Sequence, residues 1–335
     1  MMEYYTNNSF SHMQVFKGGQ ISLKYPQKLY IDLTQDCNMY CIMCRDKLTV
    51  TGKVMDMDLF KRIVNETASF VSSYSLFNWG EPLIVKDFRE RIMYLISKKN
   101  KDTTIDISTN GILLDKEMIT FLKSNDVIVT VSFDGANKET FEKIRRGGNF
   151  ENICRNVENL TRIYDEKELD KTPGIYVSIQ KDNQYQLLEI AKLVNRLGIK
   201  RIGFGLVTSP DEYAPELSES IREIIKETKN YLDNEGMLND LYPTKVGSFL
   251  WDGNDYYHES NYIVDRNCNA PFVSASIGFN GDIYLCCNVG ELVDNIDNKS
   301  FSEIWSGERY DTLRKAVNDR SLMPYRCKNC AWFNR

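Results

Sequence analysis

Histidine is nearly absent from this chain of 335 residues, which contains only His12 and His258. Neither residue stands at ligand spacing from the three cysteines at 37–44, so histidine does not complete a tetrahedral zinc site at that segment. A metal held there must rely on thiolates, and the local sequence supplies only three of them.

A surplus of positive charge is also missing, since 42 Lys and Arg residues oppose 47 Asp and Glu residues and leave a net charge of −5. No global basic field would therefore recruit nucleic acid. No apolar run approaches the roughly 18–20 residues of a membrane span. The start from Met1 to Met13 lacks the hydrophobic core of a signal peptide. We expect a cytoplasmic protein that binds neither nucleic acid nor a membrane.

Cysteine is the residue type that is present in an informative pattern. The chain has nine cysteines, and an odd number with clustered spacing argues against a secreted disulfide framework. In a reducing cytosol such cysteines more often bind metal. The length and an apolar content of 42% suit a globular protein with a substantial core.

Three of the cysteines, Cys37, Cys41 and Cys44, fall within eight residues. Three thiolates on a tight loop suit a [4Fe–4S] cluster, whose fourth iron then has no protein ligand and is open to a small molecule. The alternative is a zinc knuckle completed by a distant cysteine.

The CxxxCxxC spacing of these cysteines resembles the signature of the radical S-adenosylmethionine (radical SAM) superfamily. The resemblance implies that SAM binds the open iron through its amino and carboxylate groups. It also implies that the reduced cluster cleaves SAM to methionine and a 5′-deoxyadenosyl radical, which takes a hydrogen atom from substrate. Met43 stands where the family often has an aromatic residue, and its soft apolar side chain can still cover adenine or the cluster.

Strand-like and helix-like patterns alternate between residues 28 and 207. Such alternation predicts βα units with a parallel sheet, and six units are two short of a full (β/α)8 barrel. The resemblance implies an α/β fold with a partial (β/α)6 barrel. We predict strands at 28–34, 75–79, 105–107, 127–133, 175–180 and 201–207, and helices at 57–72, 85–99, 117–123, 137–145, 149–164 and 184–197. The expected divisions are an N-terminal extension at 1–27, the barrel at 28–208, a linker and bridging helix at 209–261, and a small auxiliary-cluster domain at 262–335.

Polar residues and glycine follow four of the predicted strands, at the edge where α/β barrels build their active sites. The segments are Cys37, Asn78–Pro82, Ser108–Gly111 and Ser132–Gly135. Turns use the same residue types. Four such segments on one edge, beside a cluster, are better explained as a cofactor pocket.

The resemblance assigns roles to two of these segments. Gly80 and Glu81, in Gly-Glu-Pro, look like the GEP motif, whose backbone and carboxylate meet the SAM amino group. A carboxylate beside an ammonium group is an electrostatically favoured pairing. Ser108 and Asn110 resemble the polar residues that lie below SAM in the family.

The resemblance also assigns residues to the ribose and carboxylate of SAM. Ser132 and Asp134 look placed for one of these two groups. Arg145 matches the arginine that holds the SAM carboxylate, a task that suits a bidentate guanidinium. Arg146 is the competing residue for this role.

A second cysteine set lies in the last 68 residues. Asn280-Gly281 predicts the turn of a hairpin at 277–284, and a helix is predicted at 301–319. Four thiolates without histidine fit either a zinc ribbon or a second [4Fe–4S] cluster. The pattern resembles the SPASM/twitch extension, which holds an auxiliary [4Fe–4S] cluster, and the three further cysteines of the full SPASM form are missing. The expected ligands are Cys268, Cys286, Cys327 and Cys330.

Two cysteines remain to be placed. Cys286 and Cys287 cannot point the same way on a strand, and the spacing from Gly281 favours Cys286 as the ligand. Cys287 is then either a small buried residue or a thiol that faces the active site and donates a hydrogen atom. Cys154 lies on the apolar face of a predicted helix, which favours a place in the core.

The first functional hypothesis is dehydrogenation or epimerisation of a small polyol, sugar or cyclitol. Only 36 residues precede Cys37, which we expect to be too few for a leader-peptide-binding domain, and the single-cluster form resembles sugar and cyclitol dehydrogenases. The alternative is a ribosomal-peptide-modifying enzyme, an epimerase or cross-linking maturase, with a groove lined by the tail at 1–26 and by Trp251, Tyr256 and Tyr257. Either enzyme needs an electron donor such as flavodoxin or ferredoxin. A zinc-bound scaffold is the non-enzymatic alternative.

Overall fold

The computed structural model describes residues 13–15, 21–44, 52–165, 171–207, 210–216, 218–241, 268, 270–287, 291–297, 299–317, 319 and 321–328. The expected ligand Cys330, the groove residues Trp251, Tyr256 and Tyr257, and most of the tail at 1–26 lie outside these residues. Within the described part of the chain, no helix combines the length and the apolar character needed to cross a bilayer.

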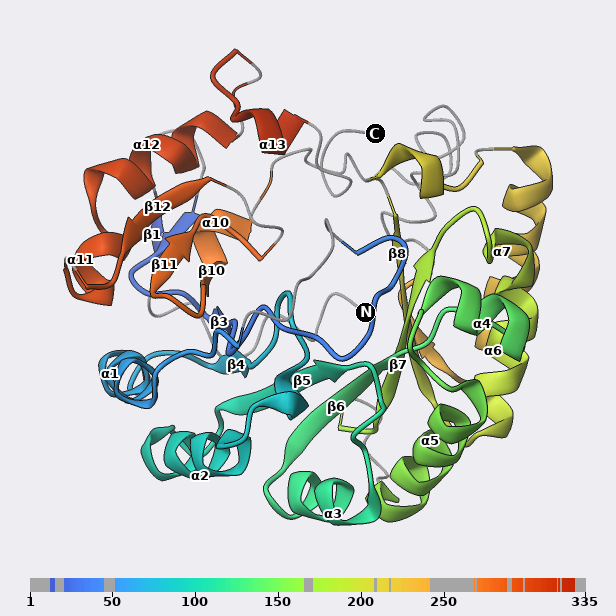
Figure 1. Cartoon of the computed structure of the whole chain (residues 1–335). Helices are drawn as coiled ribbons and strands as arrows, with labels where there is room; N and C mark the ends of the chain where they lie inside the picture. The colour runs from blue at the N-terminus through green and yellow to red at the C-terminus, as the bar shows by residue number, and fades with distance from the viewer. Residues whose placement is uncertain are drawn as a thin grey trace.

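Six parallel strands form the wall of a partial barrel (Figure 1). Each strand pairs with the next one along the chain, as the alternating pattern predicts. The fold is therefore of the expected α/β class with a partial (β/α)6 barrel. The strands are β3 (Lys28–Ile31), β4 (Ser73–Ser75), β5 (Thr104–Thr109), β6 (Val127–Ser132), β7 (Gly174–Ile179) and β8 (Arg201–Leu206).

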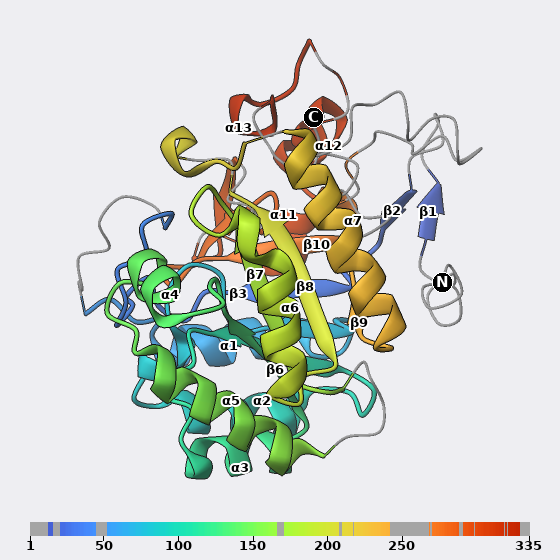
Figure 2. The ribbon, with the colours of Figure 1, turned by 90° about the vertical axis from the view of Figure 1, so that its right-hand side faces the viewer.

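Helices cover the outer face of this wall, so each strand has one face against helices and the other toward the barrel interior (Figure 1). In β6, Val127, Val129 and Val131 are fully buried in the core, and the residues between them point to the opposite face. The helices are α1 (Met57–Thr67), α2 (Phe88–Lys98), α3 (Lys116–Ser124), α4 (Lys138–Ile144), α5 (Phe150–Tyr164), α6 (Leu187–Arg196) and α7 (Glu219–Asn234). Figure 2 shows α6 and α7 side by side over β7 and β8.

Local capping explains where several helices begin. A side-chain oxygen before the first turn accepts a backbone N–H that would otherwise have no partner. This occurs at Asp56 before α1, Asp115 before α3, Asn137 before α4 and Asn149 before α5.

Some boundaries differ from those predicted. Helix α1 ends at Thr67 rather than at 72, because Ser72 and Ser73 both donate backbone N–H groups to the carbonyl of Gln27 and so begin the pairing of β4 with β3. Strand β4 accordingly starts at Ser73, and it ends at Ser75, short of the predicted 79. Helix α2 starts at Phe88 rather than at 85, because a 3-10 turn at Pro82–Ile84 precedes it.

The sheet continues beyond the six barrel strands in both directions. Strand β9 (Leu238–Asn239) pairs with β8, and β10 (Ser274–Ile277) pairs in parallel with β3. The predicted hairpin joins β10 to β11 (Asp282–Tyr284), with Gly281 in the left-handed region at φ +83°. An unpredicted strand, β12 (Leu292–Asn295), completes this edge. The C-terminal segment therefore extends the barrel sheet itself.

In the described part of the C-terminal segment, four helices accompany the strands. They are α10 (Ala270–Val273), α11 (Phe301–Trp305), α12 (Glu308–Val317) and α13 (Tyr325–Lys328). The single predicted helix at 301–319 is wrong, because the chain breaks at Ser306 and Gly307. A side chain at Gly307 would approach the carbonyl of Glu303 to 2.9 Å, so the tight turn there favours glycine.

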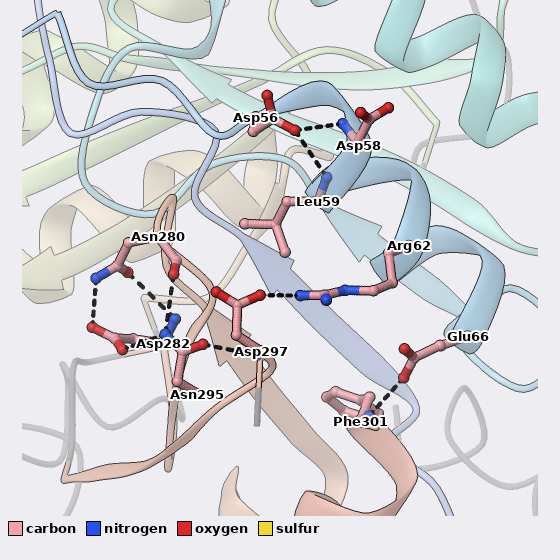
Figure 3. Close-up of polar contacts among 10 residues, drawn as sticks. All are labelled: Asp56, Asp58, Leu59, Arg62, Glu66, Asn280, Asp282, Asn295, Asp297 and Phe301. Carbon is pink, nitrogen blue, oxygen red and sulfur yellow. Dashed lines mark hydrogen bonds and ion pairs between the residues drawn. The ribbon is translucent and has the colours of Figure 1, made fainter. Parts of the chain in front are cut away.

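Helix α1 ties the C-terminal segment to the barrel (Figure 3). Arg62 forms an ion pair of 2.5 Å with Asp297, and Glu66 accepts the backbone N–H of Phe301 at 2.6 Å. The second contact places a carboxylate at the N-terminus of α11, where the helix dipole favours negative charge. These contacts hold the end of β12 and the start of α11 against the barrel wall.

Candidate active site

The loop of the first cysteine set leaves the carboxyl end of β3. An isolated antiparallel β-bridge between Thr34 and Val54 joins the two flanks of this loop. Within the loop, the N–H of Tyr40 donates to the carbonyl of Arg146 at 2.8 Å. The N–H of Ile42 donates to the carbonyl of Ile144 at 2.9 Å. The sheet edge and the segment after α4 therefore fix the path of residues 37–44.

Two polar groups from distant parts of the chain face the thiols of this loop. The Asn110 amide nitrogen lies 3.7 Å from the sulfur of Cys37, and a guanidinium nitrogen of Arg145 lies 3.8 Å from the sulfur of Cys41. Burial raises the pKa of Cys37, and burial raises that of Cys41 to about 11 against the opposing effect of Arg145. Thiolates at these positions are therefore expected when a bound metal displaces the protons.

The donor set fits an iron–sulfur cluster. Cys37, Cys41 and Cys44 are half-buried, and the charge of Cys44 acts on both of the other thiols. A [4Fe–4S] cluster would bind each of these three thiolates at a different iron atom and leave its fourth iron open.

The loop after β4 packs directly on the backbone that leads to Cys37. A side chain at Gly80 would collide with the Thr34 carbonyl oxygen and lie 2.6 Å from that of Asp36. The N–H of Glu81 also donates to the Asp36 carbonyl at 2.9 Å. Glycine is therefore required for this close approach of two backbones.

Glu81 joins the ends of β4 and β5. Its carboxylate accepts the Thr109 hydroxyl and the Asn110 N–H, both at 2.7 Å, and the Leu83 N–H at 3.1 Å. The residue is only 2% exposed, and burial raises the pKa of Glu81 to about 7. Its predicted contact with the SAM amino group stays a prediction. Thr109 was not singled out in the sequence, although it lies within one of the polar strand ends.

A pH-dependent stability difference is expected between the parent and Glu81→Gln. The pKa of Glu81 is about 7 in the folded protein and 4.5 ordinarily. The stability that its protonated form contributes is therefore fully present below pH 4.5 and is lost as the pH rises through 7. Glutamine does not titrate. The free energy of unfolding of the variant, relative to that of the parent, should therefore rise by up to about 3 kcal/mol across this pH range. Urea unfolding of the metal-free proteins at pH 5 and pH 8 measures the effect. A difference that does not change with pH would contradict it.

Arg145 and Asp134 form a buried ion pair of 2.7 Å. Asp134 is fully buried and also accepts the N–H of Ser178 at 2.7 Å, while its backbone carbonyl accepts the Asn183 amide at 3.0 Å. Arg145 is 7% exposed, whereas Arg146 points to solvent. Of the two arginines, Arg145 is thus the one whose side chain faces the cysteine loop.

The two predicted serines lie at the same edge of the sheet. Ser108 and Ser132 are half-buried near the carboxyl ends of β5 and β6. Ser108 stands opposite Thr130 in register, and Ser132 stands opposite Tyr176. Their contacts with SAM remain predictions.

The described cysteines of the second set come from three elements. Cys268 precedes α10, Cys286 follows β11 and Cys327 lies in α13, and all three are half-buried. The fourth expected ligand, Cys330, lies outside the described residues.

A buried arginine connects the segments that carry two of these ligands. The Arg314 guanidinium lies 4.1 Å from the Trp305 ring and 4.0 Å from the Tyr310 ring, and it donates to the Pro271 carbonyl at 3.0 Å. The Tyr310 hydroxyl donates to the Leu285 carbonyl at 3.4 Å. Helix α12 thereby holds the backbone next to Cys268 and Cys286 in one place.

Replacing Arg314 with methionine is expected to cost about 2–4 kcal/mol, because buried carbonyl groups lose their donor. We also expect loss of iron from the C-terminal site, measured by iron content alongside urea unfolding. Arg309→Met is the matched control, since Arg309 lies on the same helix, is exposed and donates to the Leu292 carbonyl. The control is expected to lose less than about 1 kcal/mol. Equal losses in the two variants would contradict the role given to Arg314.

Two family models match the chain in the regions that hold the two cysteine sets. The model of the radical SAM superfamily matches residues 31–177, and the model of the SPASM iron–sulfur cluster-binding domain matches residues 268–331. The matches confirm the expected resemblance. They imply SAM and two [4Fe–4S] clusters as cofactors.

Relatives match the chain along most of its length. The mycofactocin maturase MftC of Mycolicibacterium smegmatis is 31% identical, over 93% of this chain and 77% of the relative. A tungsten-containing aldehyde ferredoxin oxidoreductase cofactor-modifying protein of Pyrococcus furiosus is 25% identical, over 90% and 86%. The fold is similar to that of Streptococcus suis SuiB bound to its precursor peptide SuiA, with a TM-score of 0.67 and 16% identity over 94% and 76% of the two chains. The chain belongs to the radical SAM superfamily and carries a C-terminal SPASM domain.

Proposed function

We propose that this enzyme modifies a ribosomally made peptide. The observation that carries the proposal is the likeness to a maturase over 93% of the chain, through the barrel and the SPASM region alike. The similar fold of SuiB, which was solved with a precursor peptide, adds support. A polyol, sugar or cyclitol was the first expectation from the sequence, and the likeness to a maturase favours the alternative of a peptide.

When bound, a reduced [4Fe–4S] cluster and SAM supply a 5′-deoxyadenosyl radical that abstracts a hydrogen atom from substrate. In our proposal Cys37, Cys41 and Cys44 hold this cluster. Asn110 faces Cys37 and accepts the N–H of Ile112 through its own amide oxygen at 3.0 Å, so its donor side stays turned toward the cysteine loop.

The charged residues of the site orient SAM in this proposal. Arg145 binds the SAM carboxylate, and Asp134 is a positioning residue that fixes the guanidinium through their 2.7 Å pair. Glu81 sets the loop of Gly80 against the cysteine backbone and lies near the SAM amino group. Ser108 and Ser132 add hydroxyl groups along the same edge of the sheet.

The auxiliary cluster is assigned to Cys268, Cys286, Cys327 and Cys330. The segment that leads to Cys286 is joined to the barrel wall, because β10 of the SPASM region pairs directly with β3. An electron donor of the flavodoxin or ferredoxin class completes the set of partners.

The test uses anaerobically reconstituted protein with SAM and dithionite. The peptide encoded by a small open reading frame beside the gene is compared with a panel of sugars, polyols and cyclitols. We expect the peptide to stimulate formation of 5′-deoxyadenosine and to change in mass or in residue chirality. Stimulation by a member of the polyol panel and none by the peptide would overturn the proposal.

A further inference from the structure

Three side chains that the proposed cofactor site does not use converge from separate elements. They are Tyr30 on β3, Tyr176 on β7 and Cys287 after β11. The Tyr30 hydroxyl and the Cys287 thiol form a hydrogen bond. Tyr176 lies close enough to Asp240 and Cys287 for their charges to act on its phenol.

The two tyrosines face the barrel interior. In β3 the neighbours of Tyr30, Leu29 and Ile31, are fully buried in the core between strands and helices, so Tyr30 points to the opposite face. Tyr176 alternates in the same way with the core residues of β7, Ile175 and Val177. In a barrel with its helices outside, that opposite face is the interior.

The backbone around Cys287 is fixed at the mouth of the barrel. Pairing of β10 with β3 sets Ser276 opposite Tyr30. Asn78, after β4, contacts the Ser276 hydroxyl at 3.2 Å and, with its amide oriented to satisfy its neighbours, donates to the Cys287 carbonyl at 2.8 Å. The same amide accepts from the Trp79 indole at 3.0 Å. Cys287 is thus held where β3, β4 and β10 meet.

Adjacent residues Cys286 and Cys287 differ in their nearest groups. Cys286 lies close enough to Tyr310, which is fully buried beside Arg314 in the SPASM region, for its charge to act on that phenol. Both cysteines act on Tyr30, but Cys287 has the larger effect and forms the hydrogen bond, and Cys287 also acts on Tyr176. This difference agrees with the alternation of side chains along an extended segment.

The neighbouring strand β8 leaves room for Tyr176. A side chain at Gly205 of β8 would collide with the Tyr176 hydroxyl, and one at Gly203 would lie 3.2 Å from the ring. Two glycines two residues apart on one face therefore leave room for this ring. The phenol is held inside the barrel.

We propose that Cys287 is not a cluster ligand but the residue that returns a hydrogen atom to the substrate radical, which makes the reaction an epimerisation. The inference rests on the proposed function. The S–H bond of Cys287 breaks and a C–H bond forms at the substrate carbon, which leaves a thiyl radical. One electron from a low-potential donor of the ferredoxin class and one proton from solvent restore the thiol. Tyr30 is a positioning residue that holds the sulfur through their hydrogen bond.

Iron content tests the placement of Cys287 without any substrate. Cys287→Ala and the control Cys154→Ala, a half-buried cysteine on α5, are expected to keep about eight iron atoms, whereas Cys286→Ala keeps about four. A Cys287→Ala protein with about four iron atoms and a Cys286→Ala protein with about eight would make Cys287 the ligand and overturn the proposal.

Turnover in D2O tests the transfer itself, with the peptide or polyol that stimulates the parent. The parent is expected to form an epimer with one solvent deuterium at the inverted carbon. Cys287→Ala should form 5′-deoxyadenosine within about twofold of the parent but lose the deuterated epimer by at least about 100-fold. Unchanged deuterium uptake by Cys287→Ala would overturn hydrogen donation, as would a parent product without inversion. If only a polyol stimulates the parent to form 5′-deoxyadenosine, the proposed peptide substrate is contradicted. The role of Cys287 is then tested with that polyol.

Discussion

Replacing Cys37, Cys41 and Cys44 together with alanine is expected to lower the iron content from about eight atoms to about four and to abolish SAM cleavage. The reason is that these half-buried thiols form the donor set beside Arg145 and Asn110. Iron and sulfide analysis with EPR spectra of reconstituted protein measures the first effect. Chromatography of 5′-deoxyadenosine after reduction measures the second.

The same experiment also tests the SPASM region. Four iron atoms left in the triple variant belong to the auxiliary site, whose proposed ligands are intact. A parent with about four iron atoms and bound zinc, and a variant with zinc alone, would make the C-terminal site structural. Cys154→Ala is the control for loss of a thiol elsewhere, since Cys154 packs against the core on α5.

The sequence predicted the barrel well because its strands and helices carry regular apolar patterns. Leu29 and Ile31 in β3, and the valines of β6, alternate as buried strands require. The boundaries were less predictable where distant parts of the chain decide them. The end of α1 depends on the carbonyl of Gln27, which belongs to the entry of β3. No local pattern carries that information.

The same distinction holds for the candidate site. The polar strand ends correctly indicated one shared edge, and the structure brings Asn110 and Arg145 next to Cys37 and Cys41. The partners of the charged residues were missed for a physical reason. Ser178 serves Asp134 through its backbone N–H, which every residue except proline possesses, so its sequence contains no signal for the contact.

The sequence also did not predict the pairing of β10 with β3. The turn at Gly281 fixes the hairpin, but nothing in its pattern identifies the strand beside which it lies. This pairing brings Cys287 next to Tyr30. It therefore favours testing Cys287 as a thiol that faces the active site rather than as a small buried residue.

Replacing Arg145 with methionine is expected to destabilise the metal-free protein by about 3–5 kcal/mol, because Asp134 then keeps a buried charge without its partner. Asp134 is fully buried and lies 2.7 Å from the guanidinium. Reconstituted Arg145→Met should also bind SAM about 10- to 100-fold more weakly, which is the usual contribution of a hydrogen bond to a charged group. Urea unfolding and equilibrium dialysis with labelled SAM measure the two effects.

A double variant separates the role of Arg145 in stability from its role in binding. Adding Asp134→Asn to Arg145→Met removes the stranded charge, so most of the lost stability should return while SAM affinity stays low.

Arg146→Met is the matched control, since Arg146 is exposed. It should change stability by less than about 0.5 kcal/mol and leave SAM binding intact. If the double variant recovered SAM affinity together with stability, Arg145 would act only by neutralising Asp134. If Arg146→Met alone weakened SAM binding, the carboxylate would belong to Arg146. Recovery of stability without affinity assigns the carboxylate to Arg145, because the double variant is then folded and free of the stranded charge but still lacks the guanidinium.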